Sequence, residues 1–346
     1  MEFIGNLFYH RILDIFSTIS LRIMSLYEEN NLRLPIEFQH ELPENFSGPV
    51  LVGARILYRP RNTYQIIIQE IANEFYSIRF NIIKLFEDKG FEWISERPGM
   101  HSRTMLKGNL YHKVKGSVKA YIEQDQFMLL WAEKVECSCE FSGKQEYLTF
   151  DIYYSNELLQ QLTFFFPELQ RTIENSKMKL LLKNPVFITP DMRDIIQQII
   201  NCPFDETTRR FYFDLKVREY LYLMLQRAYT KDKVTHQFTA YETECIKKAH
   251  DYLVEDLSRE PPSVRALSRI AAINEFKLKV GFKQIFGQSI FGALHDARMR
   301  KAKELILSSN KPLKEICTLT GYPRITNFIT AFRKKYGYTP GSLRRK

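Results

Sequence analysis

The chain has 346 residues, 45% of them hydrophobic, and a formal net charge of +10. All of that charge lies in the last third: residues 236–346 carry 21 Lys/Arg against 10 Asp/Glu, and the rest carry 29 against 30. The composition excludes gross disorder, the lack of any run of about 18 uncharged apolar residues excludes a membrane span, and the local positive charge predicts a polyanionic partner, nucleic acid before an anionic membrane surface.

Residues 1–49 form an N-terminal extension of mixed character. Phe3 to Leu26 fits one amphipathic helix, although Arg11, Asp14 and Arg22 interrupt its apolar residues. Because no basic stretch precedes an apolar core, we expect no signal peptide. The five cysteines form no regular framework, which is typical of a reducing compartment, and we therefore expect a cytoplasmic protein.

Residues 50–155 have the pattern of a β-rich domain. Short runs of β-branched and aromatic residues alternate with connections that contain Gly, Pro, Asn and Asp. Strands at this spacing favour an antiparallel sandwich or barrel. The predicted strands are Val50–Tyr58, Tyr64–Ile68, Tyr76–Leu85, Val118–Tyr121, Phe127–Trp131, Val135–Phe141 and Tyr147–Tyr154.

Cys137 and Cys139 lie in one of these strands and suggest redox or metal chemistry as one interpretation. They alternate with Glu136, Ser138 and Glu140, so both thiols belong to the apolar face of the strand. We favour core packing for them and keep the redox or metal role as the alternative. We expect no metal and no cofactor, because the seven histidines form no zinc-type H-x-x-x-H pair and no nucleotide-binding glycine motif is present.

Residues 156–228 form a predicted helical extension of the β-rich domain. Thr189 is expected to cap a helix that begins with Pro190 and Asp191. A second helix over residues 208–228 carries two neighbouring apolar stripes, and this wide face is our candidate for a homodimer contact. For Phe164–Phe166 we favour core or subunit packing over the lining of a ligand pocket. The polar residues 229–240 predict a linker.

Residues 241–346 are predicted to be entirely helical and to contain two helix-turn-helix units, at 263–287 and 312–337. In each unit the second helix carries two large apolar side chains four positions apart, which places both on its buried face. Phe291 to Ser308 predicts a connecting helix of roughly five turns. The predicted structural core of the two units consists of Leu267, Leu278, Phe282, Ile316, Gly321, Phe328 and Phe332.

Local signals mark where these helices begin and turn. Ser263 and Asn274 are expected to cap the two helices of the first unit, because their side chains can accept a free backbone N–H. Ile270 and Leu319 are expected to extend the apolar faces of the first helix of each unit. Gly321 takes the turn position of the second unit, where a positive φ suits glycine.

A helix-turn-helix inserts its second helix into the DNA major groove, so the residues off the buried face are candidates for DNA contact. Lysines and arginines can bond guanine edges or phosphates, and threonine and isoleucine methyls can contact a thymine methyl. Lys311, Lys334 and Lys335 are better placed for phosphates, and the terminal Arg344–Lys346 is an additional candidate. The predicted DNA-binding residues are Phe276, Lys277, Lys279, Val280, Lys283, Arg324, Ile325, Thr326, Ile329, Thr330, Arg333 and Lys334.

Three C-terminal motifs together resemble the DNA-binding domain of AraC/XylS-type transcription regulators. They are R-M-R-K-A-K-E-L-I (298–306), I-C-T-L-T-G-Y (316–322) and N-F-I-T-A-F-R-K-K-Y-G-Y-T-P (327–340). The resemblance covers roughly residues 240–345 and implies a sequence-specific DNA-binding domain of seven helices. Ala272 and Cys317 depart from the usual Gly and Ala of the family. Val280 replaces an arginine of many relatives, which predicts weaker or different base contacts by the first unit.

A second resemblance lies upstream. The stretches I-T-P-D-M-R-D-I-I-Q-Q-I-I-N-C-P-F (188–204) and K-V-R-E-Y-L-Y-L-M-L (216–225) are similar to the siderophore-responsive PchR-like subset of the family. This implies an N-terminal sensor domain without identifying its ligand, and a small-molecule or siderophore-like effector is one candidate partner. The chain is thus expected to be an α+β protein, with a mostly antiparallel β sensor domain, a helical extension and an all-α double helix-turn-helix domain.

These patterns predict a transcription regulator that binds double-stranded promoter DNA, with RNA polymerase as a further partner if it activates. One alternative is a DNA-repair alkyltransferase with the same DNA-binding domain, which would need an activated cysteine in a P-C-H-type context. None of the five cysteines lies in one, so we expect no enzyme. The other alternative is a nonspecific nucleic-acid-binding protein, which would bind in a salt-dependent manner without a preferred site.

Overall fold

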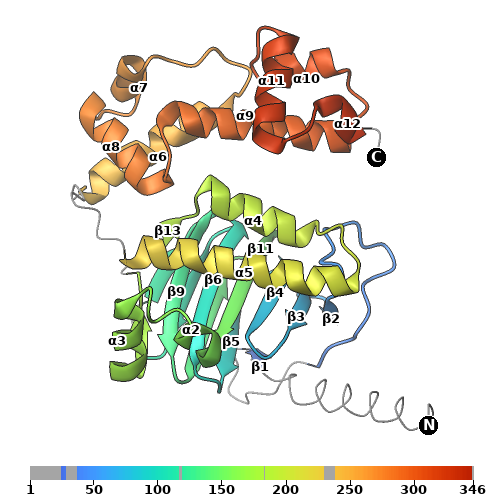
Figure 1. Ribbon diagram of the computed structural model, residues 1–346, viewed down its shortest axis with the longest axis vertical. Helices are drawn as coiled ribbons and strands as arrows, with labels where there is room; N and C mark the ends of the chain where they lie inside the picture. Colours follow the sequence, from blue (N-terminus) through green and yellow to red (C-terminus); the bar gives the residue numbers. More distant parts are fainter. Residues whose placement is uncertain (1–24, 29–36, 117–118, 183, 230–237, 345–346) are drawn as a thin grey trace. The chain divides into compact units, whose positions relative to one another are not determined.

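The structure is a computed structural model that describes residues 25–28, 37–116, 119–182, 184–229 and 238–344. The chain divides into two compact units, Met1–Thr230 and Lys231–Lys346, which we describe separately (Figure 1). The division falls inside the predicted linker 229–240, of which residues 230–237 lie outside the described parts; Tyr229 ends one helix and Ala240 begins the next. Within the described parts, no helix has both the length and the apolar character that a membrane span requires.

Two antiparallel sheets build the N-terminal unit. The larger has the order β12-β9-β6-β11-β4-β3-β2, with β13 also paired to β9, and the smaller has the order β1-β5-β10-β7-β8. The strands of the larger sheet are β2 (Arg55–Pro60), β3 (Tyr64–Ala72), β4 (Tyr76–Leu85), β6 (Gly99–Lys107), β9 (Gln126–Ala132), β11 (Gln145–Ser155), β12 (Met178–Leu180) and β13 (Val186–Phe187). Those of the smaller are β1 (Ser25–Glu28), β5 (Lys89–Ser95), β7 (Leu110–Val114), β8 (Lys119–Ile122) and β10 (Val135–Phe141).

The described part of this unit contains four helices: α2 (Asn156–Gln160), α3 (Pro167–Asn175), α4 (Pro190–Ile200) and α5 (Glu206–Tyr229). The predicted helical extension 156–228 is therefore helical only in part, because β12 and β13 lie between α3 and α4. The α4 helix begins as predicted, since Thr189 accepts a hydrogen bond from the backbone N–H of Met192 and Pro190 occupies the first turn. Figure 1 shows α4 and α5 side by side across one face of the larger sheet.

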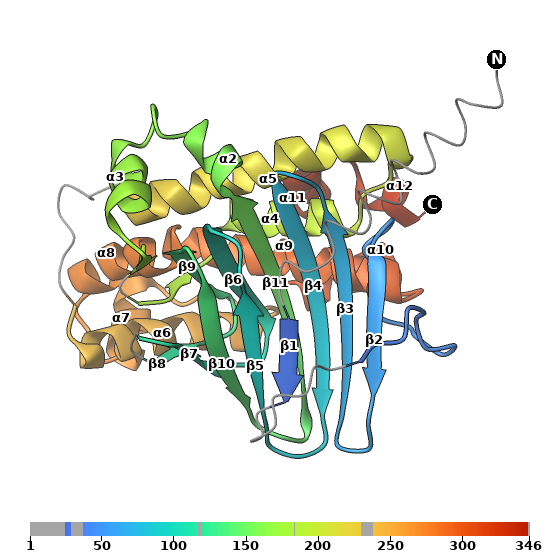
Figure 2. The same cartoon turned by 90° about the horizontal axis from the view of Figure 1, so that it is seen from below.

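Two apolar cores lie on the two faces of the larger sheet. On one face α4 and α5 bury residues such as Ile196, Val217 and Leu221 against Phe80 and Phe150 of the sheet. On the other face the smaller sheet packs against the larger one and forms a sandwich with it (Figure 2). Side chains from both sheets fill the core between them. The antiparallel sandwich predicted from the strand pattern is therefore present, but with helices covering its outer face.

The strand predictions were incomplete at several places. β5, β6 and β7 were not predicted, although β6 lies next to the centre of the larger sheet. The predicted strand Val50–Tyr58 begins only at Arg55, because Val52 and Gly53 form a turn in which Gly53 has a φ of +83°. The predicted helix Phe3–Leu26 lies outside the described residues up to residue 24, and its last two residues belong to strand β1.

The C-terminal unit is helical throughout its described residues, as predicted. The connecting helix α9 begins one residue earlier than predicted, and its Phe291 is exposed while Ile290 is buried. The helices are α6 (Ala240–Glu255), α7 (Val264–Ile270), α8 (Glu275–Phe286), α9 (Ile290–Ser308), α10 (Leu313–Leu319), α11 (Ile325–Tyr336) and α12 (Pro340–Arg344).

The two helix-turn-helix units, α7–α8 and α10–α11, share the same local chemistry at their turns. Ala272 and Gly321 both adopt a left-handed backbone, with φ of +54° and +72°. A Cβ on Gly321 would lie 2.3 Å from the carbonyl oxygen of Leu257, so glycine is required there for space as well as for conformation. Ser263 and Asn274 cap α7 and α8 through their side chains, as expected.

Six of the seven residues assigned to the cores of these units are buried, and Gly321 is half-buried at its turn. Leu267, Leu278, Phe282, Ile316, Phe328 and Phe332 have no exposed surface. The second unit packs with Met299, Ala302 and Ile306 of α9. Ile270 and Leu319 were wrongly placed on the apolar face: they occupy matching positions at the ends of α7 and α10 and are 50% and 41% exposed.

Candidate DNA interface and a polar cavity in the N-terminal unit

The helices α8 and α11 present matching surfaces. In both, the apolar pair spaced four residues apart is turned inward. Of the remaining positions in the first three turns, Gly281 of α8 is buried and the others are exposed or half-buried. Val280 and Ile329 are half-buried, and the other ten predicted contact residues are exposed: Phe276, Lys277, Lys279, Lys283, Arg324, Ile325, Thr326, Thr330, Arg333 and Lys334.

Some of the basic residues near these helices take part in ion pairs within the unit. Lys277 pairs with Glu242 of α6, and this hydrogen bond is the main reason why the pKa of the Glu242 carboxyl is lowered. Lys335 Nζ lies 2.9 Å from Asp296 Oδ1, and Lys311 pairs with Glu315. Exposed pairs of this kind are weak, so a phosphate can replace the carboxylate partner of Lys277 or Lys311. The half-buried Lys335 is held in the fold instead.

The helix α9 joins the two helix-turn-helix units and packs against both. It contacts α6 and α8 on the first side and α10, α11 and α12 on the second. The buried Asp296 of α9 forms ion pairs with Lys335 and with Arg300, whose Nε lies 3.1 Å from Asp296 Oδ2. A helix of 19 residues is about 28 Å long, which sets the scale of the separation between the two units.

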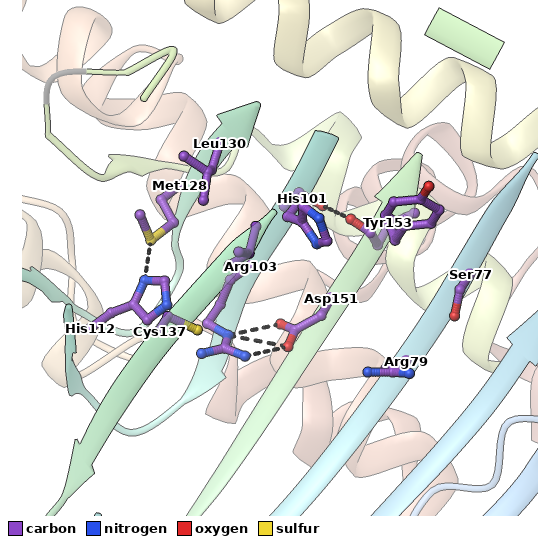
Figure 3. Close-up of a pocket in the computed structure, with 13 residues that line it drawn as sticks. Ser77, Arg79, His101, Arg103, His112, Met128, Leu130, Cys137, Asp151 and Tyr153 are labelled. Atoms are coloured by element: carbon purple, nitrogen blue, oxygen red, sulfur yellow. Dashed lines mark hydrogen bonds and ion pairs between the residues drawn. The ribbon is translucent and has the colours of Figure 1, made fainter. Parts of the chain in front are cut away.

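A second candidate site is a cavity of about 50 Å³ inside the N-terminal unit, which is room for a few water molecules. Charged and polar side chains line it, among them Arg79, His101, Arg103, His112 and Asp151 (Figure 3). They come from β4, β6, β7 and β11, so strands of both sheets build the site. Apolar atoms form most of the cavity wall, but buried charged groups around a cavity in such a sandwich are unusual enough to suggest a function.

Arg103 and Asp151 form the central ion pair of this cavity. The guanidinium Nη2 lies 2.9 Å and Nε 3.1 Å from Asp151 Oδ2, and the side chains are only 10% and 16% exposed. Arg103 also donates from Nη1 to Cys139 Sγ at 2.8 Å and lies over the ring of Trp93. Burial alone would lower the pKa of Arg103, but Asp151 and the neighbouring thiols together raise it, so the guanidinium is charged.

Burial also controls the histidines of this cavity. It lowers the pKa of His101 to about 3, with a further contribution from the positive charges of Arg79 and Arg103. For His112, burial followed by the charge of Arg103 lowers the pKa well below its ordinary value. Both imidazoles are therefore neutral at neutral pH.

We predict that acid destabilises the N-terminal unit through His101. Its folded pKa of about 3 lies below the unfolded value near 6.5, so the unfolded state binds more protons in that interval. The stabilisation is complete above pH 6.5 and is lost as pH falls towards 3, by at most about 1.4 kcal/mol per pH unit. Urea unfolding between pH 7.5 and 5 should show a shallower slope for His101→Gln than for wild type. Equal slopes for His101→Gln and wild type would contradict the prediction.

The sequence predictions missed this cavity. His112 and Arg103 lie in strands that were not predicted, and Asp151 lies within a strand that was predicted only as an apolar run. The available signal was a single carboxylate between Phe150 and Ile152, because a charge inside an apolar strand needs a partner. Cys137 and Cys139 face the core between the sheets, so the predicted burial of both thiols is confirmed.

Comparison with known proteins extends these observations. Residues 267–346 match the family described as a helix-turn-helix domain, and residues 84–238 match the regulatory protein PchR N-terminal domain. The regulatory protein PchR of Pseudomonas aeruginosa is 33% identical over 117 residues, which are 33% of this chain and 39% of PchR. Both matches support the resemblance to AraC/XylS-type regulators. The N-terminal unit carries a domain of the PchR type.

Two other proteins are similar to the C-terminal unit of this chain. The C-terminal domain of AraT, a response regulator from Geobacillus stearothermophilus, is 31% identical, covers 29% of this chain and 84% of that one, and has a TM-score of 0.28. The bifunctional transcriptional activator/DNA repair enzyme AdaA of Bacillus subtilis is 25% identical over 104 residues, 30% of this chain and 49% of AdaA. The matched part of the chain thus spans about two fifths of PchR and half of AdaA.

Proposed function

We propose that this protein is a sequence-specific DNA-binding transcription regulator that places α8 and α11 in two successive segments of the major groove. The observation that carries the proposal is the presence of two equivalent helix-turn-helix units on one connecting helix, each with its outward face free of large core residues. Adjacent major-groove segments on one side of DNA are about 34 Å apart, a distance comparable to the length of α9.

We assign different roles to the exposed residues of the two helices. Arg324, Thr326 and Thr330 of the second unit, and Lys279 and Lys283 of the first, are proposed to contact base edges. Arg333, Lys334 and Lys277 are proposed to contact phosphates, which position the protein on DNA. Because the half-buried Val280 offers no hydrogen-bond donor, we expect the second unit to contribute more to sequence preference than the first.

Selection of bound sequences from a random DNA pool by the full-length protein tests this proposal. We expect an enriched motif with two elements about one helical turn apart. Salt-sensitive binding without any enriched sequence would instead support a nonspecific nucleic-acid-binding protein and would refute the assignment. The selected motif would then serve as the cognate site for the variants below.

Arg324→Ala should weaken binding to the selected site by about 1–3 kcal/mol and reduce sequence preference at the contacted position. The reason is the position of Arg324, which is exposed immediately before the first turn of α11. Titration of labelled cognate and random duplexes measures both effects. Lys334→Ala is the matched control, since loss of a phosphate contact should weaken both duplexes equally. An equal loss on both duplexes for Arg324→Ala would make it a phosphate contact.

We further propose that the N-terminal unit senses a signal, with a small molecule such as a siderophore-like compound as the candidate effector. The similarity of residues 84–238 to the PchR N-terminal domain supports this role. A signal can alter DNA affinity only if it binds one arrangement of the protein more tightly than another. DNA titrations with and without a candidate compound measure this coupling. In the cytoplasm, RNA polymerase would be a partner if the regulator activates transcription.

The α5 helix supports a further proposal, that the N-terminal unit forms a homodimer. One of its two apolar stripes packs on the sheet, whereas Phe211, Leu215 and Tyr222 are 68%, 49% and 49% exposed. Phe164 and Phe165 are also exposed, so they are not core residues, although Phe166 packs against the core. Apolar surface of this kind is typical of a protein–protein contact. Sedimentation equilibrium of wild type and Leu215→Glu would measure the association.

We propose no enzymatic activity. All five cysteines are buried, and none lies in the P-C-H-type context that an alkyl-accepting thiol requires. A relative that is described as a DNA repair enzyme is similar to only 30% of this chain. Incubation with alkylated DNA followed by mass spectrometry of the protein tests the alternative, which would require a covalent methyl transfer to one cysteine.

A further inference from the structure

Three side chains that can bind soft or borderline metal ions lie close together between the two sheets of the N-terminal unit. One ligand atom each from His112, Cys137 and Cys139 lies within 4.8 Å of both others, the one such group found in the described part of the chain. The sheet register explains the arrangement. Cys139 of β10 is paired with His112 of β7, and Cys137 lies two positions earlier on the same face of β10. All three residues are buried, with exposed fractions of 6%, 7% and 0%.

The histidine is oriented in a way that suits a ligand. His112 Nδ1 lies 2.8 Å from Met128 Sδ, so with its proton on Nδ1 the ring donates to the thioether (Figure 3). This leaves the lone pair on Nε2, which is buried and has no hydrogen-bond partner among the described residues. A buried polar atom without a partner is costly unless another group occupies the position next to it.

The spacing is close to what a metal ion requires. With Zn–S distances of ~2.3 Å and Zn–N distances of ~2.0 Å, the ligand atoms of a tetrahedral site are about 3.5–3.8 Å apart, and those of a trigonal site about 4 Å. The three ligand atoms lie within 4.8 Å of one another, so they must approach one another by about 1 Å to hold a metal ion. Small rotations of the three side chains supply this approach, and His112 and Cys137 also line the cavity of about 50 Å³.

The charges around the cluster are compatible with a cation. Arg103 is the nearest positive group, but Asp151 neutralises it through a two-point ion pair. The Arg103 guanidinium donates a hydrogen bond to Cys139 Sγ and stabilises a thiolate there. Hydrogen bonds to a ligating sulfur from a neighbouring side chain are a usual part of metal sites.

We propose that His112, Cys137 and Cys139 form a binding site for one soft transition-metal ion, Zn²⁺ or Cu⁺. The ligand set of two thiolates and one imidazole suits both ions. Binding of Zn²⁺ replaces the two thiol protons, which pass to solvent. The proposal departs from the sequence expectation that no metal is bound, and it stands independently of the DNA-binding function.

The test uses the full-length protein, stripped of metal with a chelator and kept reduced. Zn²⁺ and Cu⁺ are titrated separately in competition with a chromophoric chelator, and Co²⁺ is used as a spectroscopic probe for Zn²⁺. We expect one equivalent of Zn²⁺ or Cu⁺ to bind, and thiolate-to-cobalt absorption to develop to one equivalent. This absorption needs no variant, so it tests the site even if a substitution impairs folding.

Variants assign the binding to the cluster. Cys137→Ser and Cys139→Ser should each weaken metal binding by at least about 10–100-fold. Loss of a residue that only hydrogen-bonds to a metal ligand already has an effect of this size. Cys202→Ser is the matched control, because Cys202 is buried in the same unit outside the cluster. Met128→Leu removes the hydrogen-bond acceptor that orients His112 and should weaken the binding of both ions.

Two outcomes would overturn the proposal. One is the failure of both ions to bind the wild-type protein at one equivalent, with no thiolate-to-cobalt absorption. The other is binding that persists unchanged in the Cys137→Ser/Cys139→Ser double variant while circular dichroism shows a folded protein. Neither result would affect the DNA-selection experiment, so the two proposals fail separately.

Discussion

Replacing Phe332 by alanine should lower the free energy of unfolding of the C-terminal unit by about 3–5 kcal/mol. Phe332 has no exposed surface and lies between the rings of Phe328 and Tyr336, at centroid distances of 6.0 and 4.7 Å. It belongs to the cluster that joins α10 and α11 to α9. The substitution would leave a cavity at this junction, and neighbouring helices cannot close it without moving. Urea unfolding and hydrogen–deuterium exchange of peptides from α10 and α11 measure the loss.

Ile325→Ala is the matched control in the same helix. Ile325 is 39% exposed and lies outside the cluster, so its truncation should change stability by no more than about 0.5 kcal/mol. Exchange in α11 should therefore accelerate strongly in Phe332→Ala and remain close to wild type in Ile325→Ala. If both variants unfold at the wild-type urea concentration, Phe332 does not hold the second unit together.

The C-terminal unit was largely predictable because its signals are local. The pair Phe328 and Phe332, the cap Asn274 and the turn residue Gly321 each act within one or two helical turns of their neighbours. The predictions that were wrong in this unit concern the last turn of the short helices α7 and α10, whose apolar residues Ile270 and Leu319 are exposed. Ile270 continues the apolar spacing of α7, but the chain turns away at Ala272 before that residue reaches the core.

The N-terminal unit was less predictable because its contacts are distant in sequence. Strand β11 pairs with β4 and with β6, and in the second pair residues 148–155 lie beside residues 99–107. Strand β1 pairs with β5 across more than sixty residues, so nothing near Leu26 indicates a strand. The pattern of side chains can suggest which segments are strands. The order and register of the strands depend on contacts between residues that are far apart in the sequence, so a short stretch of sequence does not reveal them.

The same reason applies to the polar cavity. Arg103 and Asp151 are directly paired in the register of β6 and β11, and His112 is paired with Cys139 in that of β7 and β10. Each residue alone has an ordinary explanation, and only the register brings them together. The DNA-contact residues differ, because the helix period alone separates exposed from buried positions of α8 and α11.

Asp151→Ala should destabilise the N-terminal unit by about 3–5 kcal/mol, because it leaves the buried guanidinium of Arg103 without a carboxylate. Asp151 accepts from Arg103 Nε and Nη2, and Asn81 Nδ2 donates to it at 3.2 Å. Both guanidinium donors would lose this acceptor in one substitution, whereas Asn81 Nδ2 would keep Thr149 Oγ1 at 2.8 Å. Urea unfolding of the full-length protein, followed by tryptophan fluorescence, measures the change, since Trp93 lies against the Arg103 guanidinium.

Two further variants separate the cost of an unpaired charge from the value of the pair. Glu146→Ala breaks the Lys107–Glu146 pair, whose side chains are 52% and 38% exposed, and should cost no more than about 1 kcal/mol. The double variant Arg103→Met/Asp151→Leu removes both charges and should recover most of the stability that Asp151→Ala loses, because apolar side chains of similar size can fill a buried ion-pair site. Recovery would mean that folding does not require the ion pair. The reason for a buried arginine beside Cys139 would then be ligand binding at the cavity. If the double variant is as unstable as Asp151→Ala, the pair is needed to align β6 with β11, and its role is structural.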